Sequence, residues 1–355
     1  MQNDNINKKS KRVSMRDIAE KLGISKVSVC LALNGAKNVS EQTRKKVFET
    51  AEKLGYKKDA LISTVMSNIR LQERNNFCET IAIINANKDE NALQKYPIFS
   101  KYISGIKSEA DNLGYAIYEV WLHNPNLNER TLSNIMKARG IRGGIILAHT
   151  TSDSLSSHFE SIWNKFKFVS AGIKTRNSKI DFVCADKFLI ARRTAEKAIE
   201  LGNKRLGFVM DKEIDDIVDG RFSGGFLYAQ LSLPMEFRIP PFLDVAAARK
   251  DINIFKKWLN TFKPEAILSL SNYTSEWLEN LSGKISQPLR IIKIDCPSEN
   301  SEWIGMDSNY ELVGRMAVRR LSEIVNRAEG INTINATTAT VVLPNWTDNI
   351  KISIR

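Results

Sequence analysis

The sequence predicts an α/β protein in which a small all-α region at the N-terminus precedes a larger region built on a parallel sheet. Three segments with apolar residues at helical spacing follow one another within residues 14–55. From residue 80 onward, short apolar runs alternate with amphipathic segments, which is typical of strand–helix–strand units. With 355 residues, the chain is also long enough for two or three folded units.

The composition of the chain narrows the class of protein. Hydrophobic residues make up 43% of the chain and charged residues 26%, which is typical of a folded globular protein. No run approaches the roughly 18 consecutive apolar residues of a membrane span. The N-terminus lacks the apolar core of a signal peptide. We therefore expect a cytoplasmic protein with no membrane partner.

Motifs for metal, cofactor or catalytic chemistry are missing from the sequence. The four cysteines are scattered and the three histidines lack metal-ligand spacing, so we expect reduced thiols rather than a zinc site or a disulfide framework. The sequence contains neither a glycine-rich nucleotide-binding motif nor a G-x-S-x-G nucleophile elbow. We expect no cofactor, no metal and no enzymatic activity.

Positive charge is concentrated near the N-terminus. Residues 1–75 hold 16 Lys and Arg against 8 Asp and Glu, a balance of +8 within a total of +12. This distribution indicates a polyanionic partner for the N-terminal region. A merely solvated basic face is the alternative, and charge alone does not decide between the two.

The N-terminal elements begin with a basic tail over residues 1–12 and continue as two short helices. Ser14 can cap the first helix, and Gly23 follows its end. Its apolar stripe consists of Met15, Ile18, Ala19 and Leu22. Ser25 can cap the second helix, whose inward-facing residues are Val29, Ala32 and Leu33. Three or four residues separate the two helices, which is the spacing of a helix-turn-helix.

A third helix completes the small region. Ser40 can cap it, Glu41 lies in its first turn, and Gly55 closes it. Its buried stripe is expected to consist of Val47, Phe48, Ala51 and Leu54. Three helices that share one core make a feasible small domain, although helical spacing alone is more often a sign of core packing than of function.

The outer face of the second helix suits the major groove of duplex DNA. It carries small hydroxyls, one lysine and branched apolar side chains, which match base edges and thymine methyl groups. Phe48 and Tyr56 are the only aromatic residues within residues 1–75. A protein that binds single strands needs stacking platforms, so duplex DNA is favoured as the partner.

Residues 13–56 resemble the headpiece of the LacI/GalR family of bacterial regulators. The similarity includes the D-I-A-E-K-L-G-I-S run, the Asn-Gly after the second helix, the V-S-E-Q-T-R-K-K-V run and the closing Leu-Gly-Tyr. The resemblance implies that base-reading positions are occupied by Lys26, Val27 and Leu31. It implies that phosphate-gripping positions are occupied by Ser14, Arg16, Ser25, Ser28, Asn34, Asn38, Ser40 and Thr43. Leu31 stands where many members have Arg, which predicts an apolar contact instead of a guanine contact.

The family has a hinge after the headpiece that folds into a helix on operator DNA. Here Lys58-Asp59 replaces the usual Pro-Asn, and Asp59 can still act as a cap. The resemblance places Val65 and Met66 at the wedge that enters the minor groove. Since Val65 is shorter than the usual leucine, we expect a smaller bend, or a wedge that relies on Met66.

The larger region contains eight predicted strands, over residues 81–84, 116–120, 144–147, 168–170, 181–184, 205–209, 266–270 and 290–294. Helices are expected between them, as over residues 99–113 and 187–201. The order of elements is similar to the two-lobed, periplasmic-binding-protein-like sensor domain of the same family. This resemblance implies a doubly wound sheet in each lobe and a ligand in the cleft at the carboxyl ends of the strands. Candidate effector-binding residues are Phe99, His149, Arg221, Asn272 and Asp295, each of which also has an ordinary structural interpretation.

These observations together predict an allosteric transcription regulator, with a repressor favoured. We expect four parts: a tail over residues 1–12, a helix-turn-helix domain over 13–57, a hinge and linker over 58–76, and an effector-binding and dimerisation domain over 77–355. The expected partners are double-stranded operator DNA, a sugar-like small molecule and a second copy of the chain, with a tetramer left open. An architectural DNA binder without an effector, and a solute-binding component, are the alternatives. The resemblance also implies association with the bacterial nucleoid.

Overall fold

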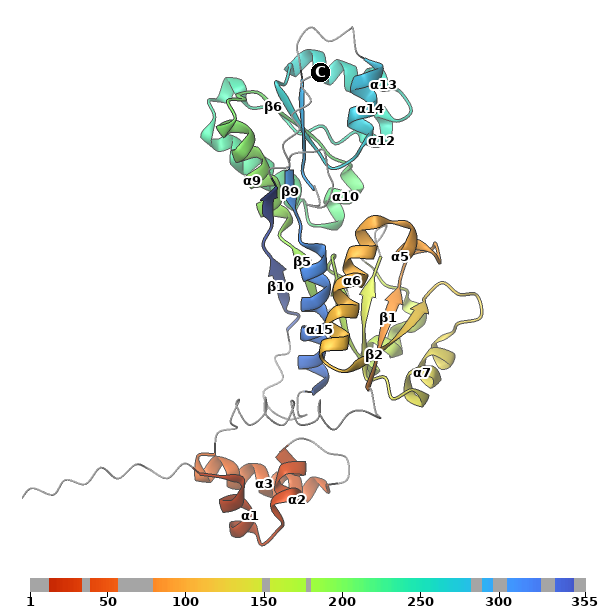
Figure 1. Cartoon of the computed structure of the whole chain (residues 1–355), viewed down its shortest axis with the longest axis vertical. Helices are drawn as coiled ribbons and strands as arrows, with labels where there is room; N and C mark the ends of the chain where they lie inside the picture. The colour runs from red at the N-terminus through yellow and green to blue at the C-terminus, as the bar shows by residue number, and fades with distance from the viewer. Residues whose placement is uncertain are drawn as a thin grey trace, which may run out of the picture. The chain divides into compact units, whose positions relative to one another are not determined.

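The computed structural model describes residues 13–33, 39–56, 79–148, 154–176, 180–281, 289–295, 305–326 and 336–347 (Figure 1). The chain divides into two compact units, a helical one that contains the N-terminal helices and an α/β one.

The helical unit contains the three helices that the sequence predicts. They are α1 (Met15–Leu22), α2 (Lys26–Leu33) and α3 (Glu41–Leu54). Their apolar stripes meet in one core, whose buried members are Ile18, Ala19, Val29, Ala32, Leu33, Val47 and Ala51. The predicted stripes are therefore confirmed, with Met15, Leu22, Phe48 and Leu54 packed at the edge of this core.

Local capping fixes where these helices begin and end. Ser40 accepts a hydrogen bond from the backbone N–H of Thr43 at 3.2 Å, as an N-cap does. Gly23 and Gly55 close α1 and α3 at φ of 66° and 70°, a left-handed conformation that favours glycine. The sequence signals for these helix ends are confirmed because caps depend on neighbouring residues alone.

The first sheet of the α/β unit has six strands in the described part of the chain, in the order β10-β5-β4-β3-β1-β2. All of their pairings are parallel. The strands are β1 (Glu79–Asn85), β2 (Tyr115–Trp121), β3 (Gly143–Leu147), β4 (Lys167–Ala171), β5 (Asp181–Ala185) and β10 (Ala339–Val342). The helices of this lobe are α5 (Ala92–Lys95), α6 (Pro97–Asn112), α7 (Glu129–Ala138), α8 (Glu160–Lys165) and α15 (Tyr310–Asn326), with a 3-10 turn at Ser157–Phe159.

Helices cover both faces of this sheet. One core joins Ala82 and Ile84 of β1 to apolar residues of α7 and α8. On the other side, α6 and α15 lie side by side, where Tyr115 of β2 reaches Ser322 of α15 with a 2.9 Å hydrogen bond (Figure 1). The prediction of a parallel sheet between two layers of helices is confirmed.

The second sheet has five strands in the described part of the chain, in the order β11-β9-β8-β7-β6. The strands are β6 (Leu206–Val209), β7 (Ala266–Ser269), β8 (Arg290–Lys293), β9 (Gly305–Asp307) and β11 (Asn345–Thr347), of which β11 alone pairs antiparallel. The helices are α9 (Lys187–Glu200), α10 (Lys212–Ile217), α11 (Arg221–Ala229), α12 (Val245–Ala248), α13 (Ile252–Phe262) and α14 (Tyr273–Asn280), with 3-10 turns at Gln230–Ser232 and Met235–Phe237. Here α12, α13 and α14 share a core with Val209 and Ile267.

The described chain passes between the two sheets at three points, after β5, after β9 and after β10. The crossings are hydrogen-bonded to one another. The backbone N–H of Asp186 donates to the carbonyl of Val342 at 3.0 Å, and the side-chain amide of Asn309 donates to the carbonyl of Leu343 at 3.0 Å. Since β5 and β9 each leave their sheet at a carboxyl end, the carboxyl ends of the two sheets face each other across the crossings.

All eight predicted strands are present, and three further strands were not predicted. The missed strands are β9, β10 and β11, which have three or four residues each. Strands β9 and β11 have too few residues for an alternating pattern to be recognised, and half of β10 is exposed at the sheet edge. Long-range pairing with β5, β8 and β9 makes them strands.

Two neighbouring glycines in α11 differ in the space available for a side chain. A Cβ at Gly225 would clash with the backbone carbonyl of Phe188, because α11 crosses α9 with the two backbones in close contact. A Cβ at Gly224 would meet its nearest neighbour, the Phe188 ring, at an ordinary 3.8 Å.

We predict that Gly225→Ala and Gly224→Ala change the free energy of unfolding in opposite directions. Gly225→Ala must push α11 away from α9, and we expect a loss of about 1–3 kcal/mol. Gly224→Ala stiffens the unfolded chain and suits a helix, and we expect a gain of up to about 1 kcal/mol. Urea denaturation of both variants measures the difference, and equal effects would contradict the close crossing.

Candidate functional site

The outer face of α2 is the first candidate site. Lys26 and Val27 are exposed, and the Val27 side chain has 67% of its surface in solvent although it is aliphatic. Leu31 is half-buried, while Val29, Ala32 and Leu33 hold the opposite face of the helix in the core. The structure therefore presents a lysine and an exposed aliphatic group together at the start of α2.

Hydroxyl side chains gather at the starts of α1, α2 and α3, the helices of this unit within the described residues. The Ser25 and Ser28 hydroxyls are 2.9 Å apart, and those of Ser40 and Thr43 are 2.8 Å apart. In each pair one hydroxyl can serve the helix cap while the other keeps a proton to donate. Helix N-termini also carry partial positive charge, which favours anions such as phosphates.

Two further predicted phosphate-gripping residues lie at α1. Ser14 donates its backbone N–H and its hydroxyl to Asp17, at 2.7 and 2.8 Å. Arg16 lies 3.2 Å from Glu20, and both side chains are largely exposed. An exposed pair of this kind contributes little, so the Arg16 guanidinium remains available to another anion.

Five of the predicted site residues lie outside the described residues. They are Asn34, Asn38, Val65, Met66 and His149.

The second candidate site lies at the crossings of the α/β unit, around Asp295. The Ser308 hydroxyl donates to one carboxylate oxygen of Asp295 at 2.8 Å, and the Tyr310 hydroxyl donates to the other. Burial raises the pKa of Tyr310 well above its ordinary value, so its phenol stays protonated as a donor. The ring of Tyr102, from α6, lies 5.0 Å from the Tyr310 ring. Residues of both lobes thus meet here.

Lys187, the first residue of α9, brings a positive charge into this cluster. It is 8% exposed, and its Nζ lies 5.2 Å from the ring centre of Tyr310 and 5.6 Å from that of Phe222. Burial lowers the pKa of Lys187, and the charge of Asp295 opposes that shift. Burial likewise raises the pKa of Asp295, against the influence of Lys187. Each group only partly compensates the burial of the other.

The structure brings two of the predicted effector-binding residues to this cluster. Asp295 lies within it, and Arg221 borders it through a 3.3 Å contact with Asp186, the residue before Lys187. Asn272 lies at the end of β7 and accepts a 2.9 Å hydrogen bond from Lys293. Phe99 is buried against Tyr96, and one turn later on α6 it is Tyr102 that reaches the cluster.

Sequence reasoning missed Lys187, Tyr310, Ser308 and Tyr102. Lys187 follows closely on the carboxyl end of the predicted strand at 181–184. Because side chains at such strand ends line the ligand clefts of doubly wound sheets, its position could have marked it as a candidate site residue. Nothing local in the sequence indicates that Tyr310 and Ser308 face Asp295.

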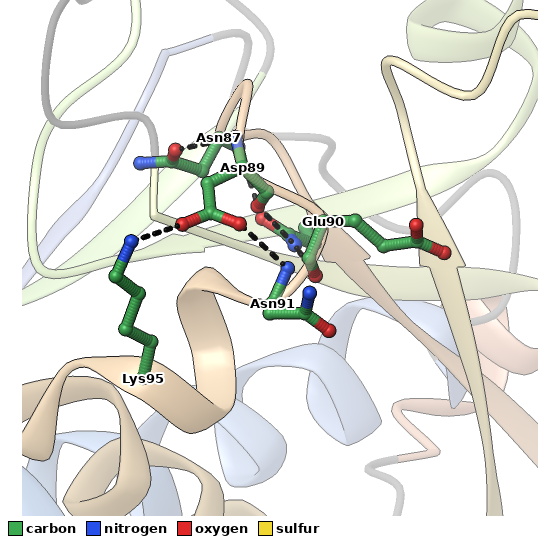
Figure 2. A network of polar contacts seen from close by, with 6 residues as sticks. Asn87, Asp89, Glu90, Asn91 and Lys95 are labelled. Atoms are coloured by element: carbon green, nitrogen blue, oxygen red, sulfur yellow. Dashed lines mark hydrogen bonds and ion pairs between the residues drawn. The ribbon is translucent and has the colours of Figure 1, made fainter.

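A polar network organises the carboxyl end of β1 in the first lobe. Asp89 accepts the backbone N–H of Asn91 at 3.0 Å and the ammonium of Lys95 at 3.0 Å (Figure 2). Asn87 donates its side-chain amide to the carbonyl of Ala148 at 3.1 Å. Ala148 follows β3 at a φ of 66°, so this bond helps to hold a strained residue at the sheet end. These bonds tie the loop after β1 to the end of β3, at the sheet end that faces the second lobe.

Metal-binding clusters and membrane-spanning helices are absent from the described residues. No group of three or more His, Cys, Asp and Glu residues there could hold a metal ion. None of the helices in that part of the chain combines the length and apolar character needed to cross a membrane.

Comparison with known proteins assigns the helical unit. Residues 14–59 match the family model for Bacterial regulatory proteins, lacI family. Catabolite control protein A of Streptococcus mutans is 26% identical over 208 residues, which are 58% of this chain and 56% of that protein. The match thus spans little more than half the length of that relative. The N-terminal region is a lacI-family helix-turn-helix domain.

Solved structures match the fold of nearly the whole chain. A complex of the transcriptional regulator CelR with cellobiose covers 95% of this chain and 98% of its own, with a TM-score of 0.54 and 17% identity. The lac repressor dimer bound to operator and the anti-inducer ONPF covers the same shares, with a TM-score of 0.53 and 15% identity. The α/β unit has the periplasmic-binding-protein-like fold of LacI-type repressors.

We predict that Asp295 makes the stability of the protein depend on pH. Its pKa is raised above 3.8, so over an interval beginning near pH 4 the folded protein keeps a proton that the unfolded chain has lost. The free energy of unfolding of the wild type, relative to Asp295→Asn, should therefore fall as pH rises through the raised pKa. Urea denaturation at stepped pH measures this difference, and a constant difference would contradict the assignment.

Proposed function

We propose that this protein is a sequence-specific transcription regulator, acting as a repressor, that binds a pseudo-palindromic operator as a homodimer under the control of a small molecule. The observation that carries the proposal is the exposed pair Lys26 and Val27 on the second helix of a lacI-family helix-turn-helix domain. Such a helix enters the major groove with its first residues against the base edges.

Base recognition is assigned to Lys26, Val27 and Leu31. Lys26 supplies a donor for guanine or thymine acceptors, and Val27 and Leu31 supply apolar contacts for thymine methyl groups. An aliphatic side chain as exposed as Val27 is unfavourable in water, and burial against a methyl group would relieve it.

Phosphate contacts are assigned to the hydroxyls and to Arg16. Ser14, Ser25, Ser28, Ser40 and Thr43 lie at helix starts, where N–H groups and hydroxyls can bind phosphate oxygens together. Asn34 and Asn38 are assigned the same role from the family resemblance alone. These contacts set affinity and register, whereas α2 sets the sequence preference.

The division of the chain follows from this role. We assign residues 1–12 to a basic tail, 13–57 to DNA binding, 58–76 to the hinge with its wedge at Val65 and Met66, and 77–355 to effector binding and dimerisation. One headpiece buries too little surface for tight specific binding, and two on adjacent half-sites supply the remainder. The solved lac repressor is a dimer on its operator, which supports this assembly, with a tetramer as a further possibility to be tested.

The effector site is assigned to the cleft at the lobe crossings, around Arg221 and Asp295, with Asn272, His149 and Phe99 as the further candidates from sequence. The related CelR structure contains cellobiose, which supports a sugar-like effector here. The role requires no catalytic step, and it places the protein on DNA in the bacterial cytoplasm.

An architectural DNA binder without an effector is the second candidate. It is favoured by the internal contacts of Asp295, since both of its carboxylate oxygens already accept hydroxyl groups of the protein.

Selection of bound sequences from a random duplex library at physiological salt tests the proposal. We expect enrichment of a pseudo-palindrome, with A·T pairs opposite the aliphatic residues of α2. Binding without enrichment would leave a nonspecific DNA binder. An operator whose binding no small molecule alters would favour the second candidate.

We predict that Lys26→Ala relaxes sequence preference more than it weakens binding to random DNA. The loss of one base contact should lower operator affinity by about 5- to 150-fold, which corresponds to about 1–3 kcal/mol. Lys53→Ala, which removes an exposed lysine near the end of α3, should lower both affinities equally and slightly. Equal losses for Lys26→Ala on operator and random DNA would remove it from the base-reading set.

A further inference from the structure

The second lobe buries two lysines, and they differ in how their ammonium groups are used. Lys293 donates to the carbonyl of Ser271 at 3.0 Å and to the amide oxygen of Asn272 at 2.9 Å. The residue Lys187 is nearly as buried, yet its ammonium forms neither a hydrogen bond nor an ion pair within 4 Å with any described residue. Its Nζ is not among the buried atoms that lack a partner, so Lys293 is bonded within the fold, whereas the donors of Lys187 are left to solvent or to a ligand.

Among the described residues, the groups around Lys187 stabilise its positive charge without forming a hydrogen bond or an ion pair with it. Two ring faces, of Phe222 and Tyr310, flank the ammonium. Asp295 attracts it electrostatically, but the carboxylate oxygens of Asp295 are bonded to Ser308 and Tyr310. The three donors of Lys187 are therefore left for something other than Asp295.

A second cation borders the same place. Arg221 begins α11, about half of its side chain is exposed, and its one described ion pair is the 3.3 Å contact with Asp186. Asp186 is also occupied in capping α9, where it accepts the backbone N–H of Leu189 at 3.0 Å. The starts of α9 and α11 thus supply two cations: Lys187 has no ion pair among the described residues, and Arg221 shares the Asp186 carboxylate with the cap of α9.

We propose that the effector carries an anionic group, a carboxylate or a phosphate, which accepts hydrogen bonds from Lys187 where the two lobes join, with Arg221 beside it. This inference rests on the proposed role of the cleft as the effector site. An anion gains more here than a neutral hydroxyl, because charge-assisted hydrogen bonds are about twice as strong as neutral ones. The lowered pKa of Lys187 agrees with an ammonium that the protein alone does not fully compensate.

The first experiment compares neutral and charged forms of the same sugars on the full-length protein. The probes are glucose, gluconate and glucose 6-phosphate, with the corresponding triads of galactose and ribose, and binding is measured by calorimetry and by the shift in Tm. We expect at least one acid or phosphate to bind about tenfold or more tightly than its neutral parent. Neutral sugars that bind as tightly, or charged probes that all fail to bind, would overturn the inference. Inorganic phosphate alone, added at the same concentration, separates recognition of phosphate from recognition of the whole molecule.

The second experiment tests Lys187 itself. Lys187→Met keeps the shape and removes the charge, and we expect the charged probe to bind about 10- to 100-fold more weakly, the loss of one charge-assisted hydrogen bond. Without ligand, its Tm should equal or exceed that of the wild type, since a charge that burial disfavours is gone. Lys197→Met, at an exposed position on the same helix, should bind the probe as the wild type does.

The outcomes distinguish this inference from the proposed function. A Tm that falls in both Lys187→Met and Lys187→Gln would mark the ammonium as structural and overturn the inference, as would unchanged affinity for the charged probe. Operator selection is measured separately. If no operator is selected but the charged probe binds, the regulator role is wrong and the anion site is retained. If an operator is bound tightly but no probe shows an anion preference, the anion site is wrong and the regulator role is retained.

Discussion

The three crossings between the lobes constrain the α/β unit more than any other feature. They are bonded to one another through Asp186 and Val342 and through Asn309 and Leu343, so the lobes cannot shift without changing these contacts. The same crossings deliver the candidate site, because Lys187 follows the first of them and Ser308 and Tyr310 form the second. A ligand held by these residues therefore acts on the joint between the lobes. Coupling of about 1–3 kcal/mol at such a joint is enough to change an affinity 5- to 150-fold.

The candidate site at the joint contains two buried charged groups. Lys187 and Asp295 attract each other, yet they form no ion pair within 4 Å, and each is shifted toward its neutral form by burial. Buried ionic groups that are incompletely paired reduce stability and are often retained at functional positions. Lys293, which donates to Ser271 and to Asn272, shows that this lobe can bury a lysine together with hydrogen-bond acceptors for it.

The helical unit shows a comparable division between stability and function on a smaller scale. Seven buried residues form its core, and serine or threonine hydroxyls stand at the starts of its helices. The hydroxyls at these helix starts are also the groups that we propose to bind phosphates. Val27 lies outside the core and is 67% exposed, on the face that we propose to contact base edges.

The sequence by itself determined the local structure of this protein. Three helices and eight strands follow from hydrophobic periodicity, and Ser40, Gly23 and Gly55 marked helix ends, because these signals depend on residues within one or two turns. The exposed face of α2 was predictable for the same reason, and two of the five effector candidates, Arg221 and Asp295, lie at the cluster. Tertiary structure decided that Lys187 stands between the rings of Phe222 and Tyr310, that Asp295 is occupied by hydroxyls, and that the short strands β9, β10 and β11 pair. Those contacts join residues far apart in the chain, and burial and charge compensation at a crossing arise only when distant segments pack together.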